Sequence, residues 1–345
     1  MTEFSHILKE WYTGNGRHDL PWRTVTDPYL IWISEIILQQ TRVAQGYDYY
    51  LRFIEHFPNV FRLAEAQEDE VLKLWQGLGY YSRARNLHTA AKQIAALGRF
   101  PDNYTEIRKL KGIGEYTAAA ICSFAYRQPY PVVDGNVYRV LSRIFGIDTP
   151  IDNNTGKKVF YALAEELMDK EEPHIYNSAI MDFGALQCTP KSPDCPICPF
   201  ADSCIAFQNG TTGSLPVKSK KTAVTERYFV YVYLEDGRNI LIRRRPSGDI
   251  WQGLYEPFLI EFSTRPSDKE VMDTIASLSA KTGSVSLVAK GLKHQLTHRR
   301  LWIDCYRLHL EKLPDLEGYL KIPETDRDLL AVPKIITDLF SLIDK

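Results

Sequence analysis

The sequence contains no long apolar run, no strong excess of charge and no disulfide framework. No stretch reaches the length that spans a membrane, and the N-terminal MTEFSHILKEWY is mixed and amphipathic, unlike a signal peptide. We therefore expect no membrane partner. We expect the protein to be located in the cytoplasm of a bacterium or in the nucleus of a eukaryote. A formal net charge of -1 argues against a protein that coats nucleic acid nonspecifically, so any such contact must be local.

Basic residues gather in five short stretches that could each meet a phosphate. Each stretch, taken alone, is more typical of a solvated face, so the charge pattern only permits nucleic-acid binding. The stretches are Arg83 with Arg85; Arg108, Lys109 and Lys111; Lys218, Lys220 and Lys221; Arg243 to Arg245; and Arg299 with Arg300.

The first part of the chain has a helical pattern. Asp27-Pro28 combines a cap with a proline at the first helical position, and apolar residues then recur at spacings of three and four. This pattern continues to about Cys204, and the segment NGTTGSLPVKSKKT that follows is polar, basic and typical of a linker. We expect an all-helical domain over residues 1–208 and a linker over 209–225.

The last part of the chain favours strands. RYFVYVYLEDGRNILIRRR contains two β-prone runs joined by Asp236-Gly237, a hairpin signal. A helix at 268–281, strands near 285–308 and a helix at 333–343 complete a smaller α+β domain, which we place at 226–345.

Residues 110–120, LKGIGEYTAAA, carry two glycines before a helix of small residues. Gly112 and Gly114 allow positive φ and a close approach, and the amides that open the next helix point at whatever lies there. The motif lacks the third glycine of a dinucleotide fingerprint and the Lys-Ser/Thr of a P-loop. It therefore predicts either a simple turn or a phosphate contact.

Four of the six cysteines lie close together, as Cys188-x6-Cys195-x2-Cys198-x5-Cys204 with four prolines between them. Prolines keep the segment out of helix and sheet, so it can wrap around an inorganic centre. A four-iron four-sulfur cluster and a structural zinc ion both fit four thiolates, although zinc sites usually have two Cys-x2-Cys pairs. Four cysteine ligands leave no open iron, which favours a structural role over catalysis, with redox sensing as an alternative.

The Gly-x-Gly hairpin (about 104–127), an Asp-Gly-Asn some twenty residues later and the cysteine spacing, in this order, resemble the helix-hairpin-helix DNA glycosylases that carry an iron-sulfur cluster. The resemblance covers roughly residues 1–208. It implies that Gly112 and Gly114 hold a DNA backbone phosphate and that the loop 188–204 holds one 4Fe-4S cluster.

Further motifs resemble the MutY-type adenine DNA glycosylases in particular. They are Tyr116 together with LPWR (20–23), SEIILQQT (34–41), GLGYYSRARNL (77–87) and VDGNVYRV (133–140). In the thymine-glycol-type branch a lysine stands in place of Tyr116 and attacks the sugar, which cuts the strand. The resemblance therefore implies a monofunctional hydrolase of base excision repair, which removes adenine opposite 8-oxoguanine or guanine in double-stranded DNA. We expect it to act as a monomer.

Breaking an N-glycosidic bond requires a proton for the departing base and negative charge near the sugar. Glu35 lies among apolar residues at i-4, i-3 and i+3, which would raise its pKa and suit a general acid. By itself, Glu35 is more typical of a partly buried structural glutamate than of a general acid. Asp134 precedes a buried helical stripe and reads as an N-cap, where helix amides would keep it ionised.

The resemblance assigns further roles. Asp134 stabilises or captures the sugar cation, Asn136 orients that site, and Tyr116 hydrogen-bonds the same carboxylate and the base. Gln40 and Tyr80 enter the base stack near the lesion, while Trp22, Arg23 and Val43 line the adenine pocket. Many relatives carry Glu or Gln in place of Ser178, so one base contact differs here.

The segment ILIRRRPSGDIWQGLYEPFLIE resembles the start of a Nudix hydrolase domain. The Arg-Glu-x-x-Glu-Glu pattern that holds Mg²⁺ is missing from SDKEVMDTIASLSAKTG, so we expect the fold without the metal site. In MutY-type enzymes this domain recognises 8-oxoguanine through a Phe-Ser-His loop. Leu296-Thr297-His298 stands there in this chain, and the kept hydroxyl and imidazole predict that lesion recognition persists.

Two alternatives remain open at this point. One is a bifunctional glycosylase/lyase that acts on oxidised bases. The other is a non-catalytic iron-sulfur module that binds DNA or senses redox state.

Overall fold

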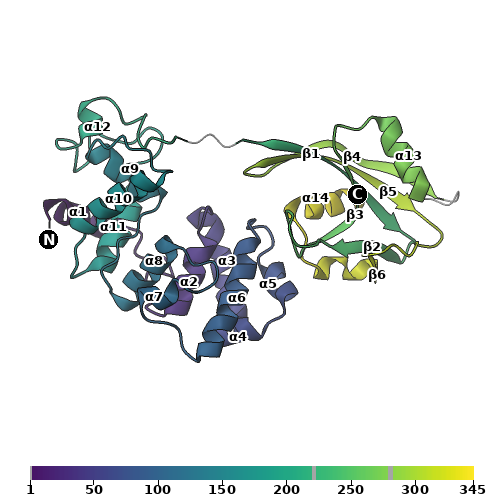
Figure 1. Cartoon of the computed structure of the whole chain (residues 1–345), viewed down its shortest axis with the longest axis horizontal. Helices are drawn as coiled ribbons and strands as arrows, with labels where there is room; N and C mark the ends of the chain where they lie inside the picture. The colour runs from purple at the N-terminus through teal and green to yellow at the C-terminus, as the bar shows by residue number, and fades with distance from the viewer. Residues whose placement is uncertain (1, 220–222, 279–282) are drawn as a thin grey trace. The chain divides into compact units, whose positions relative to one another are not determined.

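The computed structural model describes residues 2–219, 223–278 and 283–345. The chain divides into two compact units, one of Met1–Ala64 with Thr89–Lys221 and the other of Glu65–His88 with Thr222–Lys345 (Figure 1). Within the described ranges, no helix is long and apolar enough to cross a membrane.

The first unit is helical. Its helices are α1 (Glu3–Asn15), α2 (Pro28–Ile37), α3 (Val43–His56), α4 (Val60–Glu65), the later part of α6 (Ser82–Leu97), α7 (Tyr104–Ile107), α8 (Glu115–Tyr126), α9 (Gly135–Ile144), α10 (Asn154–Leu167), α11 (Pro173–Leu186) and α12 (Ile205–Gln208). Helices α1, α9, α10 and α11 bury a shared core that includes Leu8, Val140, Phe160 and Phe183. Val133, in the loop that opens α9, packs against this core.

The helix starts follow local sequence signals. The Asp27 carboxylate accepts a hydrogen bond from the Tyr29 amide at 2.7 Å, and Pro28 occupies the first turn of α2. Asp134 caps α9 in the same way. The predicted starts of α2 and α9 are therefore confirmed.

The glycines of the hairpin differ from each other. Gly112 has a φ of 77°, the left-handed conformation that the sequence predicted. A residue with a side chain would be strained in this conformation, which explains the glycine. Gly114 is the N-cap of α8 with a φ of -86°, so the expectation of positive φ is wrong at this position. An extended N-cap residue already turns the chain into the helix, and no second left-handed residue is needed.

Helices α9 and α11 approach closely at Gly184. A Cβ atom at this position would lie 2.7 Å from Cβ of Asn136 and 3.0 Å from its carbonyl oxygen. Because real Cβ atoms do not come so close, only glycine lets α11 pack against the start of α9. The packing fixes the backbone from which Asn136 projects.

The second unit is built on a six-stranded mixed sheet with the order β4-β5-β1-β3-β2-β6. Its elements are α5 (Glu68–Leu74), the start of α6, β1 (Thr225–Glu235), β2 (Asn239–Arg244), β3 (Tyr255–Phe262), α13 (Asp268–Leu278), β4 (Ser284–Gln295), β5 (Arg299–His309), β6 (Leu320–Pro323), a 3-10 turn (Glu324–Leu329) and α14 (Lys334–Ile343). Strands β1 and β5 are parallel, and the other pairs are antiparallel.

Alternation along β1 builds two cores, one on each face of the sheet. Phe229, Tyr231 and Tyr233 pack with α14, whereas Val230 and Val232 pack with α13. This is the two-residue period of a strand buried on both faces. The predicted α+β domain is confirmed, although residues 279–281 of the expected helix 268–281 lie outside the described residues.

The unit boundaries differ from the predicted domain boundaries in two places. Segment 65–88 belongs to the sheet unit, where Gln76 donates to Thr337 Oγ1 at 3.0 Å and Tyr81 donates to the Val332 carbonyl at 3.3 Å. The first half of the expected linker 209–225 packs on the helical unit. There Leu215 is buried in the core and the Ile151 amide donates to the Val217 carbonyl at 3.0 Å. Lys220 and Lys221 lie outside the described residues.

Candidate active site

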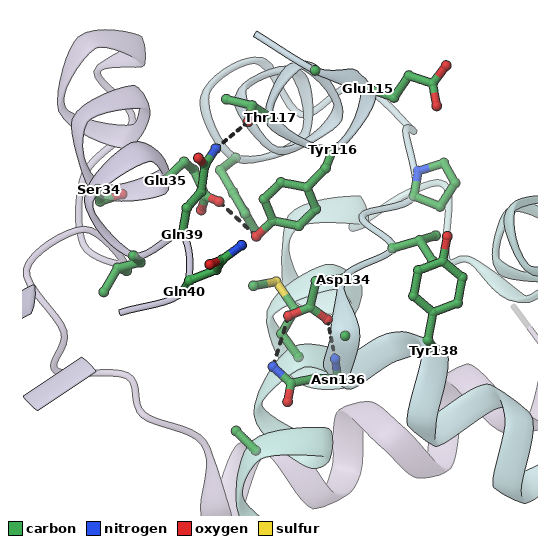
Figure 2. Close-up of a pocket in the computed structure, with 18 of the residues that line it drawn as sticks. Ser34, Glu35, Gln39, Gln40, Glu115, Tyr116, Thr117, Asp134, Asn136 and Tyr138 are labelled. Carbon is green, nitrogen blue, oxygen red and sulfur yellow. Dashed lines mark hydrogen bonds between the residues drawn. The ribbon is translucent and has the colours of Figure 1, made fainter. Parts of the chain in front are cut away.

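A cavity of about 1450 Å³ opens in the helical unit. Residues from α2, from the hairpin and from the start of α9 meet around it (Figure 2). The predicted site residues that line it are Trp22, Arg23, Glu35, Gln40, Val43, Gly112, Gly114, Tyr116, Asp134 and Asn136. The structure thus brings together ten residues that are spread over more than a hundred positions of the chain.

Glu35 is the buried carboxyl of this cavity, with 8% of the residue exposed. Tyr116 donates a hydrogen bond to its Oε2 at 2.8 Å (Figure 2). Burial raises the pKa of Glu35 to about 7 and the negative charge of Asp134 adds to the rise, while the Tyr116 bond and the charge of Arg23 oppose it. The expected rise of this pKa is confirmed. The expectation that Tyr116 bonds to Asp134 is wrong, since its hydroxyl reaches α2 instead.

Asp134 is held at the N-terminus of α9. Its Oδ1 accepts the amides of Asn136 and Val137, both at 2.8 Å, and its Oδ2 accepts Asn136 Nδ2 at 2.9 Å. Burial still raises the pKa of Asp134, although these hydrogen bonds and the charge of Arg139 lower it. The effect of burial on this pKa is therefore larger than the opposite effect of the helix amides, which the sequence analysis expected to dominate.

Arg23 reaches the cavity with support that the sequence analysis missed. The carboxylate of Asp182 is fully buried, and both the backbone amide and the guanidinium of Arg17 donate to it. Arg23 Nη2 lies 3.4 Å from the same carboxylate, and its guanidinium stands over the Phe124 ring. These partners come from positions about 160 residues apart, so no local pattern could have paired them.

Gln40 lines the cavity with a left-handed backbone. Its φ of 57° is uncommon for a residue other than glycine and marks a strained turn directly after α2. The neighbouring Gln39 donates through Nε2 to Thr117 Oγ1 at 3.3 Å and so links α2 to α8 (Figure 2).

Further cations that the sequence analysis missed also line the cavity, among them Arg42, Lys157 and Lys158. Arg42 precedes α3, and Lys157 and Lys158 lie on α10. The adjacent lysines were a visible signal, but nothing in the local sequence placed α10 beside the hairpin. Most of the predicted basic stretches in the sheet unit are paired instead, since Arg243, Arg244, Arg245, Arg299 and Arg300 each meet a carboxylate.

Four predicted site residues do not line this cavity. Ser178 is buried in α11 with 6% of the residue exposed. Tyr80, Thr297 and His298 belong to the sheet unit, where the hydroxyl groups of Tyr80 and Thr297 are 2.6 Å apart. Tyr80 is 48% exposed and has a φ of 46°, so a strained loop presents its ring to solvent.

The cysteines Cys188, Cys195, Cys198 and Cys204 line one small cavity together and form no disulfide. Arg143 donates to Cys188 Sγ at 3.4 Å, and its backbone carbonyl lies 3.5 Å from Cys204 Sγ. Among the described residues, no group of three His, Cys, Asp or Glu side chains is already arranged as a metal-ion site. Four thiols around one space, with a guanidinium beside them, are a donor set that fits a group bound by thiolates.

The chain is similar to proteins of known activity over most of its length. Residues 33–168 match the HhH-GPD superfamily of base excision DNA repair proteins, and residues 229–342 match the NUDIX domain. The adenine DNA glycosylase of Buchnera aphidicola subsp. Schizaphis graminum is 37% identical over 254 residues, which cover 73% of each chain. That of Buchnera aphidicola subsp. Baizongia pistaciae is 34% identical over 90% of this chain and 87% of its own. This chain belongs to the adenine DNA glycosylase family.

A solved structure of a thermostable thymine-DNA glycosylase has the same helical fold. It is 30% identical, with a TM-score of 0.56, and the match covers 60% of this chain and 95% of that one. Adenine DNA glycosylases are hydrolases that cleave N-glycosidic bonds in base excision repair. The predicted family, the helix-hairpin-helix fold with a Nudix-like domain and the enzyme class are therefore confirmed.

The burial of Glu35 predicts a pH-dependent stability. The folded-state pKa is raised from 4.5 to about 7, so Glu35 weakens the fold progressively as the pH rises through this window. Glu35→Gln, which cannot ionise, should match the wild type at about pH 4.5 and exceed it above pH 7. The gain in free energy of unfolding should be roughly 3 kcal/mol, at about 1.4 kcal/mol per pKa unit.

Chemical denaturation of both proteins between about pH 5 and 8 measures this difference. Glu166→Gln, which alters an exposed carboxylate on α10, is the matched control and should show no such growth. A constant difference between Glu35→Gln and wild type over the whole range would contradict the assignment.

Proposed function

We propose that the protein acts as a monomer on double-stranded DNA and removes adenine mispaired with 8-oxoguanine or guanine, without cutting the strand. The observation that carries the proposal is the pair of unlike carboxyls in one cavity. Glu35 is buried, with a pKa near neutrality, whereas Asp134 has both oxygens held by hydrogen-bond donors. Two carboxyls in different surroundings supply the acid and the anion that glycosidic cleavage needs.

Glu35 protonates the departing adenine in this proposal. A pKa of about 7 leaves about half of the carboxyl protonated at neutral pH, close to the optimum for a general acid. The Tyr116 hydroxyl occupies Oε2, so Oε1 is the oxygen that carries the transferred proton. Arg23 stands near the same group and favours its anion, which stabilises Glu35 after the proton has left.

Asp134 supports the sugar cation that forms when adenine leaves. The two amides and the Asn136 side chain fix both carboxylate oxygens, so little reorganisation is needed as positive charge develops. Asp134 either stabilises this cation through space or bonds transiently to it before water attacks. Its charge also favours the protonated form of Glu35, which couples the two roles.

The cavity offers binding groups for DNA and for an extruded base. The left-handed turn at Gly112 and the start of α8 present amides to a backbone phosphate, and Lys157 and Lys158 add positive charge. The extruded adenine lies among Trp22, Arg23 and Val43, while Gln40 occupies the gap in the duplex.

Tyr116 supports base removal without strand cutting. It places a hydroxyl beside Glu35, where a strand-cutting relative of this fold would use the amine of a lysine. Lys157 and Lys158 line the same cavity from α10, so the strand-cutting alternative needs a direct test.

Thr297 and His298 recognise 8-oxoguanine in this proposal. They lie between β4 and β5, and the Thr297 hydroxyl is within hydrogen-bond distance of Tyr80, the ring proposed to enter the base stack. Leu296 packs against the core of the sheet, so the turn keeps an apolar anchor where an aromatic residue is usual.

We also propose that Cys188, Cys195, Cys198 and Cys204 hold one 4Fe-4S cluster. When bound, such a cluster supplies a structural crosslink between the loop 188–204 and the core of the helical unit. The Arg143 guanidinium beside Cys188 would offset part of the thiolate charge. Zinc remains the alternative occupant.

Strand cleavage distinguishes base removal alone from base removal with a lyase step. Incubation with a duplex that contains adenine opposite 8-oxoguanine should release adenine, and strand breaks should appear only after treatment with alkali. Glu35→Gln and Asp134→Asn should each lower the single-turnover rate by roughly 100-fold or more, the usual weight of such a group. Glu166→Gln is the control and should keep the wild-type rate.

Breaks without alkali, formed as fast as adenine is released, would show a lyase. Wild-type protein without activity would support the non-catalytic module instead.

The preference for the lesion should depend on the turn that carries Thr297 and His298. His298→Ala and Thr297→Val should each reduce the preference for A:8-oxoguanine over A:G by roughly tenfold, because each loses a polar contact to the modified base. Thr297→Ser keeps the hydroxyl and should retain the preference. Single-turnover rates on the two duplexes measure the ratio, and an unchanged ratio in His298→Ala would remove this loop from lesion recognition.

The metal content identifies the group that the four cysteines hold. Purified protein should be brown and contain about four iron atoms per chain. Cys198→Ser should lose iron, whereas Cys122→Ala and Cys305→Ala, which change the two cysteines outside the loop, should retain it. Elemental analysis and visible absorption provide the measurement, and a colourless protein with one zinc ion per chain would reject the cluster.

A further inference from the structure

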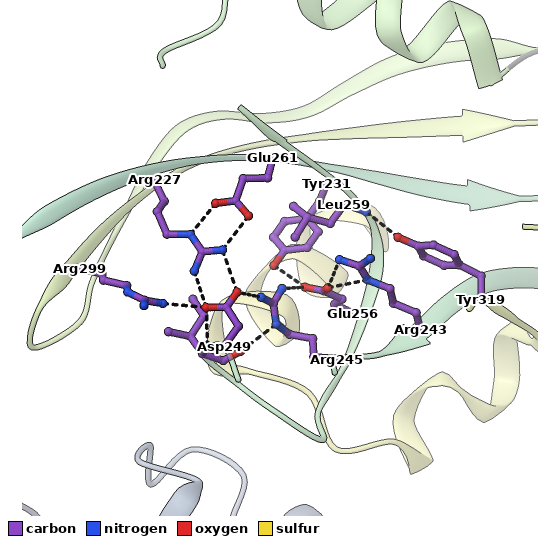
Figure 3. A network of polar contacts seen from close by, with 11 residues as sticks. Arg227, Tyr231, Arg243, Arg245, Asp249, Glu256, Leu259, Glu261, Arg299 and Tyr319 are labelled. Carbon is purple, nitrogen blue, oxygen red and sulfur yellow. Dashed lines mark hydrogen bonds and ion pairs between the residues drawn. The ribbon is translucent and has the colours of Figure 1, made fainter. Parts of the chain in front are cut away.

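A network of charged side chains fills one end of the sheet unit, outside the cavity described above. Its centre is Asp249, in the loop between β2 and β3 (Figure 3). Arg227 donates to both oxygens of this carboxylate, at 2.6 and 2.8 Å. Arg245 donates to Oδ2 at 2.6 Å, and Arg299 donates to Oδ1 at 2.7 Å. One carboxylate therefore ties three arginines from three segments of the unit.

Asp249 is itself firmly anchored. Arg245 is only 4% exposed and also pairs with Glu256, which is fully buried. Glu256 in turn accepts bonds from Tyr231 and Arg243 (Figure 3). Although partial burial opposes ionisation, the Arg227, Ile250 amide and Arg299 contacts hold the pKa of Asp249 well below its usual range. The carboxylate is thus a charged, fixed point throughout the working pH range.

Arg299 links this point to the turn that carries Thr297 and His298. It is the first residue of β5, and its carbonyl accepts the Leu296 amide at 2.8 Å, which closes the turn. The Thr225 amide donates to the His298 carbonyl at 3.0 Å and holds the other side. The backbone of the turn is fixed by β1, and its arginine side chain is fixed by Asp249.

We propose that Asp249 is a positioning residue for lesion recognition, which acts through Arg299 on the turn Leu296-Thr297-His298. This inference rests on the proposed role of that turn in reading 8-oxoguanine. Because Arg299 is 38% exposed, it would sample other rotamers without its partner. The turn would then lose the fixed geometry that places its hydroxyl and imidazole against the base. Asp249 itself does not touch the DNA.

The network contains a matched control. Glu261 also binds the Arg227 guanidinium, at 2.6 Å through each oxygen (Figure 3). It lies on β3, which pairs with β1 and not with the strands that flank the turn. Glu261→Gln thus removes one carboxylate charge from the same network and leaves the Asp249 to Arg299 contact in place. Asp249→Asn removes that contact from one side, and Arg299→Met removes it from the other.

The test compares single-turnover adenine excision from A:8-oxoguanine and A:G duplexes in full-length Asp249→Asn, Arg299→Met, the double variant and Glu261→Gln. Asp249→Asn and Arg299→Met should each lower the ratio of the two rates by roughly tenfold, the order expected when one partly exposed, charge-assisted hydrogen bond is lost. The loss should fall on the 8-oxoguanine duplex, with the A:G rate unchanged, because the carboxyls that break the bond belong to the helical unit. The double variant should be no worse than either single one, since both act through one contact. Glu261→Gln should keep the wild-type ratio.

The outcomes separate the two levels of the proposal. An unchanged ratio in folded Arg299→Met or Asp249→Asn, or an equal loss on both duplexes, overturns the positioning role. Additive losses in the double variant also overturn it. If Asp249→Asn fails to fold, Arg299→Met alone decides, because it changes a partly exposed residue. If His298→Ala and Thr297→Val leave the ratio unchanged in the same assay, the proposed function of the turn is wrong. If these two variants lower the ratio and Arg299→Met does not, the turn keeps its proposed function and only the positioning role of Asp249 is wrong.

Discussion

The burial of one carboxyl group is the constraint around which the helical unit is arranged. Glu35 lies on α2, where eight of the ten residues are buried, and burial raises its pKa to about 7. Such a group destabilises the fold when it ionises, so its partners must be placed accurately. Tyr116 donates a hydrogen bond to Glu35, and the charge of Arg23 limits the rise of its pKa. The negative charge of Asp134 favours the protonated form of Glu35. Groups from α2, from α8 and from the N-cap of α9 thus act on a single side chain.

The two compact units divide the work of the enzyme as we propose it. The helical unit contains the carboxyls and the hairpin proposed to bind a phosphate, and the sheet unit contains the turn proposed to recognise the lesion. Segment 65–88 belongs by its contacts to the sheet unit, although it precedes most of the helical unit in sequence. Tyr80 is therefore held beside Thr297 by the same body that presents this turn. A side chain proposed to hold the DNA gap open and a side chain proposed to inspect the lesion thereby share one scaffold.

Local rules were enough to predict much of this structure from the sequence. Asp27-Pro28 and Asp134 marked helix starts because capping depends on residues two or three positions apart. The apolar neighbours of Glu35 indicated its raised pKa for the same reason. Long-range pairing could not be predicted in this way. Tyr116 donates to Glu35, which is 81 positions away, and not to Asp134, which is nearer in the sequence. Arg17 donates to Asp182 across 165 positions. The packing of the first half of segment 209–225 could not be predicted either, because its polar composition gave no sign that the helical core buries Leu215.

The most direct test of this account measures the proton on Glu35 itself. Carbon-13 NMR of protein labelled at the glutamate carboxyls, with Glu35→Gln used to assign the signal, follows the titration of this one group in the folded enzyme. We expect a pKa of about 7, and a further rise in Tyr116→Phe, which lacks the bond that favours the anion. A titration near the ordinary value of 4.5 would mean that Glu35 is ionised at neutral pH and cannot donate the proton to adenine.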